Sequence, residues 1–90
     1  MTTYINVEYA VVLRPEDGAV NAFVPLFDVN VKGGTEEEAL EMARDCIEMT
    51  AHFMLEDHAV IPGPVAMSAI KTGPGEKLSS VSASIPKQIK

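Results

Sequence analysis

The sequence predicts an α+β fold in which a three-stranded antiparallel meander leads into one long helix and a final strand. Apolar and polar residues alternate over residues 4–13, as in a strand, and two shorter apolar segments follow a turn signal. Thr35 and Glu38 then form a capping box that opens a segment of helical periodicity. A right-handed crossover through this helix most simply places the final strand parallel to the first, in sheet order 3-2-1-4.

The first strand should present two different apolar faces. Alternate residues from Ile5 to Leu13 form one face, which we expect to pack against the helix. If the helix covers only this side of the sheet, apolar side chains on the other side would face water in a monomer. The sequence therefore predicts a homo-oligomer, most simply a dimer, that buries the second face. The predicted interface residues are Tyr4, Ala10, Val12 and Phe23.

Two shorter strands complete the predicted meander. Arg14–Gly18 supplies Pro, Asp and Gly for a hairpin connection, and Val20–Val24 returns as the second strand. Pro25 ends that strand because it cannot donate a ladder hydrogen bond. Leu26–Asp28 then bends the chain into a third strand over Val29–Lys32.

The helix is expected from Glu36 to about Leu55. Its apolar arc covers about half of the circumference, which is wider than the ~100° needed for one buried face. Either the helix sits deep on the sheet, or its flank meets another subunit. We interpret the methionines Met42, Met49 and Met54 as core residues, and the opposite acidic arc as a solvated face.

After the helix, the chain needs a connection back to the sheet. Residues 57–58 close the helix, and Ile61–Pro64 is a stiff connector that cannot continue it. A short helical turn is expected over Ala66–Ile70. The last strand is predicted over Leu78–Ile85, where apolar residues and serines alternate.

Composition restricts the class of partner. The 90 residues predict a single domain, 1–90, without a separate DNA-binding module. Seven basic and thirteen acidic residues give a net charge of −6, which disfavours direct binding of nucleic acid and suits a basic protein partner. The sequence contains neither a leader peptide nor a membrane-spanning segment, so we expect a cytoplasmic location.

Four acidic residues are the candidates for a metal site. Glu8 and Asp28, together with Glu41 or Glu48, could supply the converging carboxylates of a two-metal site. However, the helix pattern directs Glu41 and Glu48 away from the sheet. We therefore interpret all four as solvated surface acids and predict neither a metal nor a catalytic residue.

Histidine and cysteine give no better candidates. His52 and His58 lie too near the exposed helix end to form a convincing ligand pair. Cys46, the one cysteine, lies among apolar helix positions, where a buried structural thiol is expected rather than a nucleophile. We predict no cofactor.

The order and spacing of these motifs resemble the HicB family of type II antitoxins over about residues 9–64. The matching segments are Tyr9-Ala10-Val11-Val12-Leu13, Asp17-Gly18, Phe23-Val24-Pro25, Gly33-Gly34-Thr35-Glu36-Glu37-Glu38-Ala39-Leu40-Glu41-Met42-Ala43 and Ile61-Pro62-Gly63-Pro64. The resemblance implies a partial ribonuclease-H-like fold without nuclease activity. It also implies a partner, a small basic HicA-like toxin of double-stranded-RNA-binding fold, whose mRNA cleavage this protein would block.

The chain differs from the family at two places. The family usually has a Pro-Gly bend after the second strand, where this chain has Leu26-Phe27-Asp28. The family also commonly adds a C-terminal operator-binding module, for which 90 residues leave no room, so autoregulation is not expected of this chain.

Three functions remain open on the sequence. The first is an antitoxin-like binding protein that contacts its toxin through the bend, with Phe27, Asp28 and Asn30 as the partner-binding residues. The second is a stand-alone homo-oligomeric interaction module without a toxin. The third is an enzyme that uses surface carboxylates, which would reveal itself by Mg²⁺ or Mn²⁺ binding and nuclease turnover.

Overall fold

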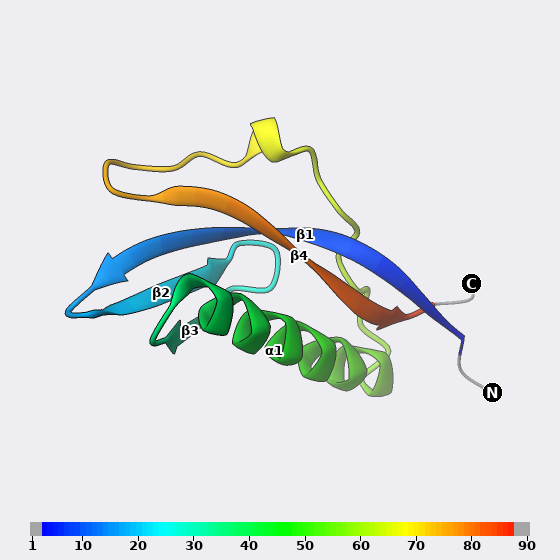
Figure 1. The fold of residues 1–90 in the computed structure, drawn as a ribbon. Helices are drawn as coiled ribbons and strands as arrows, with labels where there is room; N and C mark the ends of the chain where they lie inside the picture. The colour runs from blue at the N-terminus through cyan, green and yellow to red at the C-terminus, as the bar shows by residue number, and fades with distance from the viewer. Residues whose placement is uncertain (1–2, 88–90) are drawn as a thin grey trace.

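Four strands form one sheet in the order β3-β2-β1-β4, as the sequence predicts. The computed structural model describes residues 3–87. Figure 1 shows α1 on one face of the sheet and the segment that contains the short 3₁₀ helix η1 on the other. The elements are β1 (Tyr4–Glu16), β2 (Ala19–Val24), β3 (Val29–Gly33), α1 (Glu36–Glu56), η1 (Met67–Ala69) and β4 (Lys77–Pro86).

The last strand runs antiparallel to β1, so the predicted parallel orientation is wrong. Tyr4 pairs with Pro86 and Leu13 with Lys77. The prediction assumed that the helix alone would return the chain across the sheet. Instead, after α1 has crossed one face, residues 57–76 cross back over the other face before β4 begins (Figure 1). This additional crossing reverses the direction of β4.

The meander follows the sequence prediction closely. The β1–β2 hairpin turns at Asp17 and Gly18, which have φ angles of 48° and 78°. Two successive residues at positive φ are typical of a type I′ turn, whose twist matches that of the flanking strands. β2 and β3 pair antiparallel from Val20–Gly33 to Val24–Val29.

Local hydrogen bonds fix the start of α1. The Thr35 side chain accepts a hydrogen bond from the Glu38 backbone N–H at 3.1 Å, which confirms the predicted N-cap. The Glu38 carboxylate in turn accepts one from the Gly34 N–H at 3.1 Å. Three acids in the first turn, residues 36–38, also interact favourably with the helix dipole.

The core lies between α1 and the sheet. From α1 it takes a narrow stripe of mostly small residues, Ala39, Ala43, Ile47 and Ala51. From β1 it takes Tyr9, Val11 and Leu13, the face that the sequence assigned to the helix. The helix buries this narrow stripe fully and packs Leu40 partly against the core. Two of the methionines assigned to the core, Met42 and Met49, are exposed.

The second face of the sheet is not bare, contrary to expectation. Ala10 and Val12 are 3% and 6% exposed. The segment that carries η1 crosses this face, and its residues 69–71 line a hollow together with Val12 and Phe23. Tyr4 is separate from this group, because its hydroxyl lies 3.2 Å from Nε2 of His52 on α1. The predicted interface through these four residues stays a prediction.

Candidate protein-binding site

The bend between β2 and β3 does not place its three predicted partner-binding residues together. Phe27 is half-buried, and its ring packs edge-on against Tyr9 with ring centroids 5.0 Å apart. Asp28 is exposed at a positive φ of 53°. Asn30 is exposed on the second face, where it accepts a hydrogen bond from the Asn21 side chain at 3.0 Å. Asp28 and Asn30 are therefore available to a partner, whereas Phe27 belongs mainly to the core.

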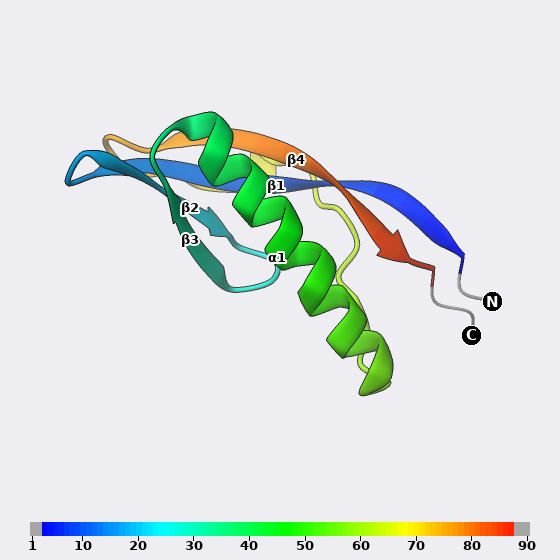
Figure 2. The same cartoon turned by 60° about the horizontal axis from the view of Figure 1, so that its bottom comes forward.

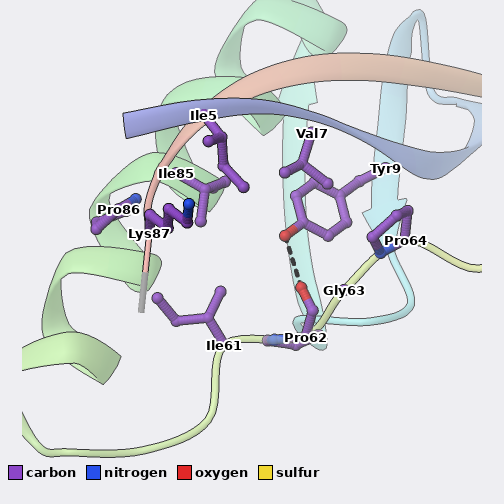
Figure 3. A pocket seen from close by; sticks show the side chains of 10 residues that line it. All are labelled: Ile5, Val7, Tyr9, Ile61, Pro62, Gly63, Pro64, Ile85, Pro86 and Lys87. Atoms are coloured by element: carbon purple, nitrogen blue, oxygen red, sulfur yellow. Dashed lines mark hydrogen bonds between the residues drawn. The ribbon is translucent and has the colours of Figure 1, made fainter. Parts of the chain in front are cut away.

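Tyr9 joins the bend to the connector that follows α1. Its hydroxyl donates a 2.6 Å hydrogen bond to the carbonyl oxygen of Pro62, as Figure 3 shows. Burial raises the pKa of Tyr9 above its ordinary value, because a phenolate would be poorly solvated there. The sequence predicted that Tyr9 faces the helix but did not predict this hydrogen bond. The one relevant feature in the sequence was the stiff connector Ile61–Pro64, which contains the acceptor.

An apolar hollow of about 210 Å³ lies beside this hydrogen bond. Figure 3 shows Ile5 and Ile85 on one side of it and Ile61 and Pro62 on the other, with Lys87 among the lining residues. The volume is below the roughly 300–1,000 Å³ of typical small-molecule sites. Its size and lining suit an inserted apolar side chain better than a cofactor.

The outward flank of α1 is the most exposed apolar surface of the helix. Met42 is 41% exposed, while Met49 and Phe53 are each 58% exposed. The half-buried Cys46 lies between them, so the four residues follow the i, i+4, i+7, i+11 spacing of one helix face. These four residues are called the α1 flank below. The C-terminal half of the helix, which carries Met49 and Phe53, extends past β2 and β3 (Figure 2).

Some charged side chains are paired within the chain and others are not. Lys32 contacts Glu16 at 3.0 Å and Lys77 contacts Glu36 at 2.9 Å, so these cations are used within the chain. The Lys32 contact lowers the pKa of Glu16 through a hydrogen bond and through its charge. Within residues 3–87, by contrast, no ion pair involves the exposed acids Asp45 and Glu56 of α1.

The described residues offer no arrangement for metal chemistry. Between residues 3 and 87, no three His, Cys, Asp or Glu side chains lie close enough together to hold a metal ion. Glu48, which the sequence predicted to point away from the sheet, instead accepts a hydrogen bond from the Ser84 backbone N–H at 2.7 Å on the edge strand β4. No helix in the described range is long and apolar enough to cross a membrane.

Comparison with known proteins finds a related antitoxin. The chain is 38% identical to Antitoxin HicB 1 of Photorhabdus laumondii over 69 aligned residues, which cover 72% of this chain and 44% of that antitoxin. The resemblance to the HicB antitoxins is confirmed. The HicB-like chain thus spans less than half the length of the curated relative that it matches. No family model matches the sequence, and no solved structure gives a significant match.

Proposed function

We propose that this HicB-like chain is an antitoxin-like binding protein that neutralises a small basic HicA-type toxin in the cytoplasm. The observation that carries the proposal is the similarity to Antitoxin HicB 1 over 72% of the chain. Inhibition works by direct protein contact, which covers the toxin's RNA-cleaving site. This chain contributes no catalysis of its own.

The charge of the molecule supports a basic partner. A net charge of −6 and unpaired acids on α1 attract a cationic protein from a distance and accelerate encounter. Exposed charges act mainly on the association rate and are screened by salt, so affinity must come from a few desolvated contacts. Raising the ionic strength is therefore expected to slow association strongly and to change dissociation less.

The bend supplies one part of the proposed contact surface. Asp28 and Asn30 are exposed and can accept hydrogen bonds from a basic partner. Phe27 supports them from below through its contact with Tyr9. Replacing Phe27 by Ala would thus also disturb the fold, and the cleaner test of this part of the surface is Asp28→Ala.

The decisive experiment first identifies a small basic protein encoded beside this chain, which the proposal predicts, and then coexpresses the two proteins for pull-down and an mRNA-cleavage assay. Wild type is expected to retain the toxin and to suppress cleavage, and Asp28→Ala is expected to weaken retention. Absence of binding by wild type would refute the proposal. Undiminished binding by Asp28→Ala would remove the bend from the contact surface.

A stand-alone oligomeric module is the second candidate. One observation favours it, namely the hollow of about 410 Å³ on the second face, lined in part by Val12, Phe23 and Ile70. Another copy could insert an apolar side chain there. Sedimentation equilibrium at micromolar concentration tests this candidate, which predicts a dimer for wild type and a monomer for Phe23→Ser.

A further inference from the structure

The α1 flank carries more exposed apolar surface than the fold requires. Core packing uses another stripe of the helix, which is centred on Ala43 and Ile47. Water-facing helix positions are normally polar, so methionine and phenylalanine at 41–58% exposure need another explanation. Methionine is flexible and polarizable, and it is frequent on surfaces that bind other proteins.

The chain itself leaves this flank open for a structural reason. On the side of α1 toward β4, Glu48 binds the Ser84 N–H and His52 contacts Tyr4. At 3.6 residues per turn, Glu48 lies about 130° around the helix axis from the centre of the α1 flank. The helix is thus held along the side toward β4, and its C-terminal half extends past β2 and β3 (Figure 2).

The charged residues beside the α1 flank favour a basic protein as the binding partner. By the same helical geometry, Glu38, Asp45 and Glu56 lie within about 70° of the flank centre. The one cation of the helix, Arg44, lies on the side toward β4. A second copy of this chain would bring acidic rims together, which is unfavourable for two molecules of net charge −6. A basic partner would gain from the same rim.

We infer that the α1 flank is a docking surface for a basic protein, which inserts apolar side chains between Met42, Met49 and Phe53 and places cations against the acidic rim. This inference rests on the proposed function and assigns a further part of the toxin-binding surface. The flank is about 16 Å long at 1.5 Å per residue, which suits one helix or strand of the partner. An apolar centre with a charged rim is the usual anatomy of a protein interface.

The test uses the small basic protein that the proposed function predicts to be encoded beside this chain, in an inactivated form, with binding measured by surface plasmon resonance. The variant Met49→Ser/Phe53→Ser changes exposed side chains, so the fold should survive, as circular dichroism will verify. We expect at least a tenfold rise in Kd, mainly through faster dissociation. The matched control is Val60→Ser/Val65→Ser, which removes apolar side chains that are 74% and 43% exposed elsewhere, and it should bind like wild type.

Two further measurements address the rim and the position of the partner. Asp45→Lys should slow association severalfold at low salt, and the difference should shrink at high salt. Cys46, the one cysteine of the chain, should react more slowly with iodoacetamide in the complex than in the free protein, as measured by mass spectrometry of its peptide.

The outcomes separate this inference from the proposed function. If wild type fails to bind the basic protein, the proposed function fails and the inference falls with it. If wild type binds and Met49→Ser/Phe53→Ser binds equally well, the inference alone is overturned. It is also overturned if wild type forms a dimer that the same double variant dissolves, because the occupant would then be a second copy.

Discussion

Gly33 offers a sharp test of how α1 is seated on the sheet. A Cβ atom added at Gly33 would lie 2.5 Å from the Ala39 backbone nitrogen and 2.9 Å from its Cα. Ordinary contacts begin at 3.4 Å, so the backbones of β3 and α1 must separate by about 0.9 Å. The same nitrogen donates the 2.9 Å hydrogen bond to Thr35 that begins the helix. Glycine is therefore required at position 33, because there is no room for a Cβ atom between β3 and α1.

The expected cost of Gly33→Ala follows from these contacts. Overpacking costs about 1–3 kcal/mol, and a weakened backbone hydrogen bond adds about 0.5–1.5 kcal/mol. A total near 3 kcal/mol would lower Tm by roughly 12–24 °C in a domain of this size. Urea and thermal unfolding followed by circular dichroism measure both quantities.

The neighbouring glycine provides the matched control. A Cβ at Gly34 would approach only the Glu38 carboxylate oxygens, at 3.8 Å, and this side chain can move. Gly34→Ala should therefore change stability by less than about 1 kcal/mol, in either direction. Equal unfolding midpoints for the two variants would refute the close seating of α1 on β3.

Three further variants test the cap, the core and the connector. Thr35→Ala should cost about 1 kcal/mol through loss of the N-cap, and a silent variant would contradict the cap hydrogen bond. Ile47→Ala should cost about 2–5 kcal/mol in denaturant unfolding, because the side chain is fully buried. An unchanged unfolding midpoint would mean that a different face of α1 packs on the sheet. Tyr9→Phe should cost about 1 kcal/mol at neutral pH through the lost bond to Pro62. Because burial raises the folded-state pKa of Tyr9, its contribution to the free energy of unfolding is fully present below the ordinary pKa of 10.0 and is lost as pH rises through the folded-state pKa. Above pH 10, wild type should therefore lose more stability than Tyr9→Phe.

Local chemistry explains why most elements could be predicted from sequence. The hydroxyl of Thr35, the glycine of the hairpin and the alternation along β1 act through near neighbours in the chain, and the structure confirms them. The order of the strands in the sheet was also predicted correctly. The direction of β4 was not predicted, because it depends on how often the chain crosses the sheet. The irregular segment 57–76 has no sequence periodicity that would indicate its extra crossing.

The candidate surface was harder to predict for a related reason. Phe27 looked like a loop anchor, but the positive φ of Asp28 reverses the chain there, and the aromatic ring packs on Tyr9. Met49 looked like a core residue because it belongs to the broad apolar arc of the helix, although it lies at the edge of that arc and far from the buried stripe. Its exposure depends on where β2 and β3 end relative to the helix, which is a property of the assembled fold.

The pairing of β1 with β4 affects how this protein is made. β1 is synthesised before the other strands of the sheet, yet one of its two neighbours is β4, the strand synthesised last of the four, and Tyr4 pairs with Pro86. At about 5–20 residues per second, residues 57–86 take roughly 2–6 s to synthesise after α1 is complete. During that interval the apolar strand β1 keeps one edge open, and such edges recruit strands from other chains. Nascent chains of this protein should therefore depend on chaperones until β4 has been synthesised.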